Sequence, residues 1–125
     1  MSEHERRYTR ISFDATTHLE QFGHDWKVDL MDISLRGALI KQPNDWQINP
    51  GKPLILSVKL SADHQIHIKC HIVHVSPDTI GCEFDQIDLD SLSELKRLLE
   101  LNMGSEEQLH RELTQLLQLG LGKAS

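Results

Sequence analysis

The sequence predicts a mainly β domain, an antiparallel barrel or sandwich, followed by two amphipathic helices. The chain has 125 residues, which is the length of one domain. Short runs rich in β-branched and apolar residues alternate with turn residues as far as Asp88, as in small all-β proteins. After Asp88, leucines recur at helical spacing. We therefore expect a single core built from strands first and helices second.

Six strands are expected, and turn residues separate them. The first two form a hairpin around the turn at 21–25, and a polar loop at 42–51 follows the third strand. The expected strands are Ser12–Leu19, Trp26–Ile33, Gly37–Ile40, Pro53–Leu60, Gln65–Val75 and Thr79–Phe84. Closing such strands into a barrel removes exposed edges.

Two helices are expected after the last strand. Ser91 and Glu94 form a capping box for the first helix, which Asn102–Gly104 ends, and Ser105 with Gln108 caps a second helix that ends near Gly120. The apolar stripes of the two helices comprise Leu92, Leu95, Leu98 and Leu99, and Leu109, Leu113, Leu116 and Leu117. We expect both stripes to pack against the barrel or each other. The alternative is that part of the second stripe binds a partner protein.

Charge and composition exclude several classes of protein. The net charge of −6 argues against DNA or RNA binding, which needs many Lys and Arg contacts. No apolar stretch reaches the roughly 20 residues that span a bilayer, and the charged start lacks a signal-peptide pattern. We therefore expect a cytoplasmic protein without membrane insertion. Cys70 and Cys82 lie in strand-like runs and are expected to be reduced packing residues.

Arginines gather near the amino terminus, at Arg6, Arg7 and Arg10. A guanidinium group can form two parallel hydrogen bonds with a phosphate or with the O6/N7 edge of guanine, and it can stack on a purine. Such a cluster suits a guanine nucleotide. The alternative is ordinary solvated charge near a chain end.

A second candidate motif is Asp32, Ser34 and Gly37. If Trp26–Ser34 is a strand, Asp32 and Ser34 project from the same face and offer a carboxylate and a hydroxyl. Gly37 permits a backbone conformation or a close approach that a side chain would forbid. Asp32 could accept hydrogen bonds from a guanine edge or hold an arginine. The alternative is a serine turn that closes a hairpin.

Together the two motifs resemble those of the PilZ family, bacterial receptors for cyclic di-GMP, which carry RxxxR followed by [D/N]xSxxG. The resemblance implies a six-stranded antiparallel β-barrel with helices at its end. It also implies that Arg6 and Arg10 grip guanine and phosphate groups, with Arg7 as an auxiliary donor. Asp32, Ser34 and Gly37 would line the guanine pocket. Glu5 stands where an arginine accompanies binding of a stacked ligand pair, which leaves one molecule or a pair open.

The resemblance, together with the expected strands and helices, divides the single domain 1–125 into an arginine-rich mobile arm at 1–11, a barrel at 12–88 and helices at 89–121. The expected function is a cyclic di-GMP receptor for control of motility, biofilm or polysaccharide. Ligand would order the arm over the barrel and change binding to an unidentified downstream protein. The alternative is a PilZ-like adaptor that works through protein contacts without nucleotide.

Enzyme and metal functions are disfavoured. The sequence has no GxSxG, HExxH or Gly-rich phosphate loop, so we expect neither catalysis nor a catalytic cofactor. Four histidines, His64, His67, His71 and His74, crowd one segment. On a regular strand His67 and His71 would be some 13 Å apart, and His71 and His74 would face opposite ways, so no metal site is expected. His74 could instead stack on a base.

Overall fold

The computed structural model describes residues 8–43 and 47–118. These residues form seven strands and two helices in chain order. The strands are β1 (Ile11–Ser12), β2 (Thr16–Gln21), β3 (His24–Ile33), β4 (Gly37–Lys41), β5 (Leu54–Lys59), β6 (Gln65–Val75) and β7 (Thr79–Ile87), and the helices are α1 (Leu89–Met103) and α2 (Glu106–Gln118).

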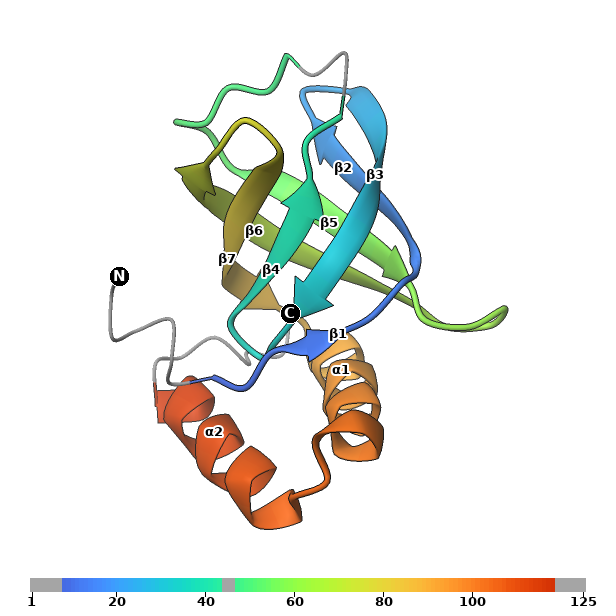
Figure 1. Cartoon of the computed structure of the whole chain (residues 1–125), viewed down its shortest axis with the longest axis vertical. Coiled ribbons are helices and arrows are strands. Elements are labelled where there is room, and N and C mark those ends of the chain that lie inside the picture. The colour runs from blue at the N-terminus through green and yellow to red at the C-terminus, as the bar shows by residue number, and fades with distance from the viewer. Residues whose placement is uncertain (1–7, 44–46, 119–125) are drawn as a thin grey trace.

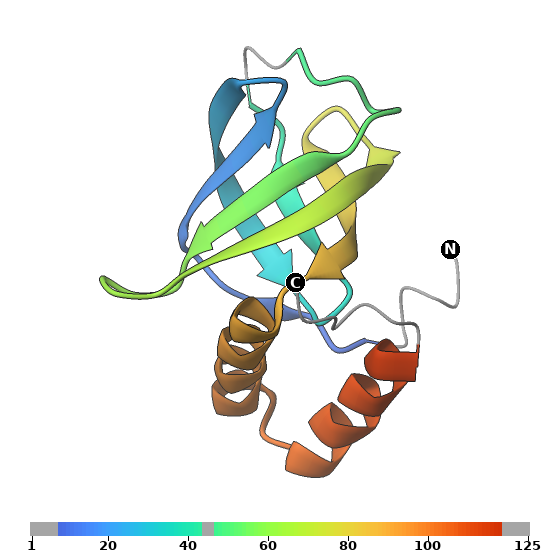
Figure 2. The ribbon, with the colours of Figure 1, turned by 180° about the vertical axis from the view of Figure 1, so that it is seen from behind.

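Six of the strands close into an antiparallel barrel. The strand order is β3-β2-β5-β6-β7-β4, and β4 pairs with β3 to complete the circle. The short β1 also pairs with β3, on the edge opposite β4. Figures 1 and 2 show the barrel from opposite sides. The expected barrel is therefore confirmed, and the β3–β4 pairing excludes the sandwich alternative.

Alternating side chains explain why these segments are strands. In β2, β5 and the first half of β6, buried residues alternate with more exposed ones, so one face of each strand fills the barrel. Phe22 and Gly23 form the two-residue turn between β2 and β3, and both have positive φ, 53° and 82°. That combination matches the tight hairpin turns whose twist suits antiparallel strands.

The first expected strand, Ser12–Leu19, is divided in the structure. Ile11–Ser12 forms β1, which pairs with Ile33–Asp32 of β3, and Thr16–Gln21 forms β2, which pairs with His24–Asp29 further along the same edge of β3. Because β4 occupies the opposite edge at Asp32 and Ile33, residues 13–15 interrupt the expected strand without moving the chain to another edge. The last strand also extends beyond the expected Phe84, to Ile87.

The amino-terminal segment is packed from Tyr8 onward. Tyr8 and Ile11 are each only 7% exposed and belong to the hydrophobic core. The expected mobile arm at 1–11 is therefore anchored in the core at Tyr8 and Ile11. Figure 1 shows this segment running from one end of α2 to β1, below the barrel.

The first helix begins one turn earlier than its expected capping box. Its N-cap is Asp88, whose carboxylate accepts a 3.0 Å hydrogen bond from the Ser91 backbone N–H. Ser91 is buried within the first turn, and its hydroxyl accepts from the His67 N–H of β6. The end of the helix is as expected, because Gly104 adopts the left-handed conformation with φ 73°.

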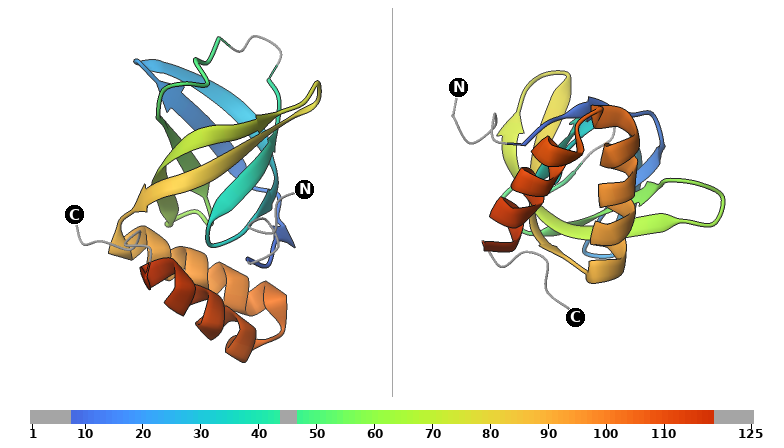
Figure 3. Two further views of the ribbon diagram at one scale, coloured as in Figure 1. Left: turned by 90° about the vertical axis from the view of Figure 1, so that its left-hand side faces the viewer. Right: turned by 90° about the horizontal axis from the view of Figure 1, so that it is seen from below.

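The two helices cover one end of the barrel (Figure 3). The stripe of α1 packs on β6 and on α2, with Leu92, Leu95 and Leu99 buried. Ser105 caps α2 as expected, and Leu109 and Leu116 are buried, but Leu117 is 48% exposed and lies outside the packed stripe. The expected helix end near Gly120 lies outside the described residues. Within 8–43 and 47–118, neither helix combines the length and apolar character needed to cross a bilayer.

Loss of the α1 cap should destabilise the protein. Burial alone would raise the pKa of Asp88, but hydrogen bonds from Ser91 and neighbouring backbone groups outweigh it, so the pKa is lowered. We expect Asp88→Ala to lower the free energy of unfolding by about 1 kcal/mol near neutral pH. Because the folded pKa is depressed, the wild-type advantage is present above the ordinary aspartate pKa and disappears as pH falls through the folded one.

Urea unfolding of wild type and Asp88→Ala across pH would measure this difference. Asp90→Ala is the matched control, because Asp90 is acidic and exposed in the same first turn. Equal stability losses in the two variants would show that the cap contributes nothing specific.

Candidate functional site

The candidate site lies on the outer face of four neighbouring barrel strands. Across β3, β4, β7 and β6, strand register aligns Asp32 with Leu39, Leu39 with Gly81, and Gly81 with His74. Paired residues in antiparallel strands project from the same face. Gly81 has no side chain, so no side chain projects from this row between Leu39 and His74.

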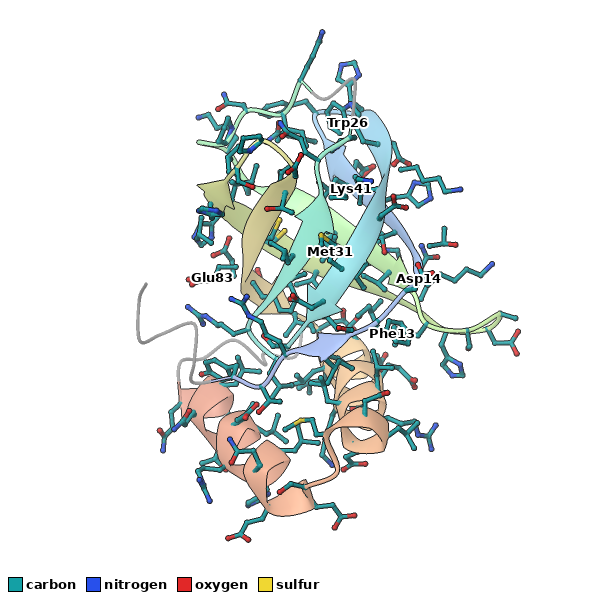
Figure 4. All side chains as sticks on the ribbon, viewed as in Figure 1. Phe13, Asp14, Trp26, Met31, Lys41 and Glu83 are labelled. Carbon is teal, nitrogen blue, oxygen red and sulfur yellow. The ribbon has the colours of Figure 1, made fainter. Side chains whose placement is uncertain are left out.

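A second row lies beside the first. It aligns Gly37 of β4 with Glu83 of β7 and Glu83 with His71 of β6. Arg36 precedes Gly37, and its Nη2 lies 3.0 Å from the Glu83 Oε1 in a partly exposed ion pair. Figure 4 shows Glu83 beside β7. Positive and negative groups are therefore interleaved across this face.

Asp32 reaches the outer face because β3 contains a bulge. Leu30 pairs with Ile40 and Asp32 pairs with Leu39, which leaves Met31 without a partner in the ladder. In a regular strand Leu30 and Asp32 would point the same way. Here Leu30 is buried while Met31 and Asp32 turn outward, and Figure 4 shows Met31 on this face.

Arg10 lies close enough to Asp32 to affect the pKa of that carboxyl group. The β1–β3 pairing places Ser12 opposite Asp32, and Arg10 precedes β1 with an exposed side chain. Partial burial raises the pKa of Asp32, and the positive charge of Arg10 partly offsets that rise. One arginine of the first motif and the acid of the second thus come together. Arg6, Arg7 and Glu5 lie outside the described residues.

Ser34 has a different position from the one expected. It follows the end of β3 and is 4% exposed, so it does not project from a strand face beside Asp32. Its hydroxyl accepts hydrogen bonds from the backbone N–H groups of Arg36 and Gly37, at 3.1 and 3.2 Å. Ser34 therefore shapes the turn that leads into β4.

Gly37 is required by close packing. A Cβ at this position would lie 2.5 Å from the carbonyl oxygen of Cys82 on β7. The Phe84 N–H also donates to the Arg36 carbonyl, at 2.7 Å. The turn of the second motif is thus pressed against β7, as the close-approach expectation for Gly37 anticipated.

His74 and His71 share the outer face, contrary to expectation. A bulge at Val73 shifts the register, so that His71 pairs with Glu83 and His74 pairs with Gly81 two residues away. Odd spacing on a regular strand would have placed them on opposite faces. His71 is engaged with Asp85, whose Oδ1 lies 2.6 Å from its Nδ1.

Sequence reasoning missed Arg36, Glu83, Leu39 and Gly81 as members of this surface. A glycine within a strand pattern signals a close approach or an open surface, so Gly81 could have been found. The Arg36–Glu83 pair joins residues 47 apart in the chain, and no local pattern predicts it.

The site has the chemistry of a binding surface for a polar, planar ligand. Among residues 8–43 and 47–118, His, Cys, Asp and Glu side chains do not form any group of three or more that could hold a metal ion.

Cys70 and Cys82 are buried and free as expected, and their mutual hydrogen bond, with burial, raises the pKa of Cys70 and keeps the thiol protonated. The exposed groups are guanidinium, carboxylate and imidazole, which donate or accept hydrogen bonds and stack.

The fold and the motifs agree with comparisons to known proteins. The family model "PilZ domain" matches residues 4–101, which is most of the chain. The chain therefore belongs to the PilZ domain family.

Solved structures share the fold at low sequence identity. The PilZ domain of YcgR from Escherichia coli, solved with c-di-GMP, is 16% identical over 90% of this chain and 97% of that one, with a TM-score of 0.64. The Borreliella burgdorferi PlzA protein, in complex with c-di-GMP, is 22% identical over 70% of this chain and 38% of that one (TM-score 0.54).

The Bacillus subtilis inhibitor of motility, MotI/DgrA, is 14% identical over 89% of this chain (TM-score 0.60), and this chain spans only 50% of its length.

The close approach at Gly37 predicts that Gly37→Ala destabilises the barrel. The added methyl group would force Gly37 away from the Cys82 carbonyl, at about 1 to 3 kcal/mol of unfolding free energy. Chemical denaturation would measure the loss. Gly51→Ala is the control, because the nearest atom to its Cβ is a side-chain oxygen 3.4 Å away. A Gly37→Ala variant as stable as this control would contradict the packing argument.

The proximity of Arg10 and Asp32 can be tested without any ligand. We expect the pKa of Asp32, followed by carboxyl-carbon NMR, to lie above the ordinary value and to rise further in Arg10→Ala, because a lowering charge is removed. A raised folded pKa means that Asp32 costs stability as pH rises from the ordinary aspartate pKa through the folded one. Arg97→Ala, a change at an exposed arginine of α1, should leave the Asp32 titration unchanged. An identical curve in Arg10→Ala would show that the two groups do not interact.

Proposed function

We propose that this protein is a cyclic di-GMP receptor and that the ligand binds the outer face built by β3, β4, β7 and β6. The observation that carries the proposal is the meeting of the two motifs, with Arg10 beside Asp32 on a PilZ barrel. The c-di-GMP complexes of YcgR and PlzA, which share this fold, support the choice of ligand.

Each group on the face has a role that suits a guanine dinucleotide. Arg10 and Arg6 donate to phosphate oxygens and to the O6/N7 edge of guanine. Asp32 accepts hydrogen bonds from the guanine N1–H and N2–H groups. The Ser34 turn fixes the backbone before β4, and Gly37 keeps this edge close to β7.

Gly81 carries no side chain, and a Cβ there would lie only 3.3 Å from the Cβ of His74. A purine can therefore lie over the Gly81 backbone beside the His74 ring, which offers a surface for stacking. Arg7 serves as an auxiliary donor. Whether one molecule or a stacked pair binds depends on the arm that contains Glu5.

Charge balance explains why the arm is needed. The charged groups next to the two rows include the acids Asp32, Glu83 and Asp85 and the arginines Arg10 and Arg36, and Arg36 is already paired with Glu83. A ligand with two phosphates adds two negative charges to this surface. The guanidinium groups of Arg6 and Arg7 supply the missing positive charge, so the ligand and the arm bind together.

The output is a change of surface rather than a chemical reaction. When the part of the arm before Tyr8 closes over the ligand, it covers one face of the barrel and presents a new one. A downstream protein then reads the ligand-bound state, in control of motility, biofilm or polysaccharide. The exposed Leu101 and Leu117 of the helices, 79% and 48% exposed, are apolar contacts available to such a partner.

Isothermal titration calorimetry with cyclic di-GMP tests the proposal. We expect wild type to bind and Arg10→Ala to bind about 100-fold more weakly or worse, because charge-assisted hydrogen bonds contribute about 1.5 to 3 kcal/mol each. Arg6→Ala should have a similar effect. Arg97→Ala removes the same charge from the exposed face of α1 and should bind like wild type.

Wild-type affinity in Arg10→Ala, with its fold intact by circular dichroism, would remove Arg10 from the site. A wild-type chain that ignores cyclic di-GMP at micromolar concentration in dilute buffer would favour the nucleotide-independent adaptor.

A further inference from the structure

A buried carboxylate on α2 holds the arginine arm. Glu112 is only 1% exposed, although it lies on a helix rich in exposed polar residues. Its Oε1 accepts from the Thr9 backbone N–H at 2.9 Å, and its Oε2 accepts from the Thr9 hydroxyl at 2.5 Å. Gln108, one turn earlier on the helix, donates to Oε2 at 2.8 Å.

This contact joins the amino-terminal segment to the last described helix. Thr9 and Glu112 are 103 residues apart. Tyr8, which precedes Thr9, and Leu109 and Leu116, about one turn from Glu112 on α2, are all buried in the core. A buried carboxylate is costly unless donors satisfy it. Three donors satisfy Glu112, and two of them come from Thr9. Moving Thr9 away would leave the buried carboxylate with too few donors, so this contact stabilises the position of the arm.

The contact lies inside the first motif. Thr9 stands between Arg6 and Arg10 in the sequence, and it is adjacent to Arg10, which lies beside Asp32. From Thr9 the chain enters β1, which pairs with β3 at Asp32. The arm is therefore held on both sides of Arg10, by Glu112 before it and by β1 after it.

We propose that Glu112 is a positioning residue for cyclic di-GMP: through Thr9 it fixes the arm so that Arg10 stays at the site, and it thereby couples α2 to ligand binding. This inference rests on the proposed function. Glu112 acts through Thr9 and does not touch the ligand.

The energetic reason is preorganisation. An arm residue that is already fixed does not have to be ordered when the ligand binds, so the conformational entropy of that residue is not lost in the binding step. Coupling is reciprocal, so a ligand that prefers the held arm must also stabilise the docking of α2. The helix pair can thus report ligand occupancy to a partner although it lies at the end of the barrel.

Calorimetry on the full chain tests the positioning role. We expect Glu112→Gln to weaken cyclic di-GMP binding about tenfold, as the loss of one fixed residue implies. Thr9→Val, which loses only the hydroxyl bond, should cause a smaller loss, and Thr9→Ser, which keeps the hydroxyl, should bind like wild type. Glu112→Gln and Thr9→Val disrupt the same contact, so the variant that combines them should bind no more weakly than Glu112→Gln alone.

Glu107→Gln is the matched control, with the same charge change on the same helix at a side chain that is 90% exposed. It should bind like wild type. Amide exchange gives a second readout, which a purely structural role for Glu112 would not move. In wild type, cyclic di-GMP should slow exchange across α2, and this slowing should be lost in Glu112→Gln.

The outcomes separate the two proposals. If wild type binds while Glu112→Gln and Thr9→Val also bind with wild-type affinity, the positioning role is overturned and the receptor function stands. Additive losses in the double variant would equally overturn it. If Glu112→Gln unfolds or undocks α2, binding by Thr9→Val and Thr9→Ser tests the positioning role instead. Equal affinities in these two variants would overturn it. A wild type that does not bind overturns both proposals.

Discussion

Two bulges in the barrel wall decide which side chains face the candidate site. In β3 the extra residue is Met31, and in β6 it is Val73. Each bulge adds one residue to a strand whose side chains otherwise alternate strictly, so every position beyond it changes face. Asp32 and His74 lie just beyond these bulges and point outward. Without them Asp32 would point into the core, where an unpaired carboxylate is costly.

The remainder of the site depends on barrel closure. Because β4 pairs with both β3 and β7, the Ser34 turn, Gly37 and the Arg36–Glu83 ion pair are held against the outer rows. The residues of the second motif therefore divide their work. Ser34 and Gly37 fix the backbone, whereas Asp32 presents a charge. A short motif can thus combine a structural turn with a binding group, because the turn places that group.

Residues 8–12 contact α2 and β3 below the barrel, and these contacts give the described part of the arm a structural partner. Tyr8 enters the core, Thr9 binds Glu112, and Ile11–Ser12 joins β3. An arm anchored in this way differs from a free polymer, since Arg10 is held near Asp32 before any ligand binds. The helices α1 and α2 close the open end of the barrel and also supply the buried carboxylate.

The sequence by itself predicted six strand regions, two helices, a hairpin turn within 21–25, the helix stop at Asn102–Gly104 and the two motifs, because these follow from side-chain alternation, backbone preferences and short spacings. Only the tertiary structure decided that the first strand divides, that Ser91 bonds to β6 while Asp88 caps α1, that Ser34 is buried, that His71 and His74 share a face, and that Thr9 meets Glu112. Register shifts and contacts between distant residues depend on how the barrel closes, and no local pattern encodes them.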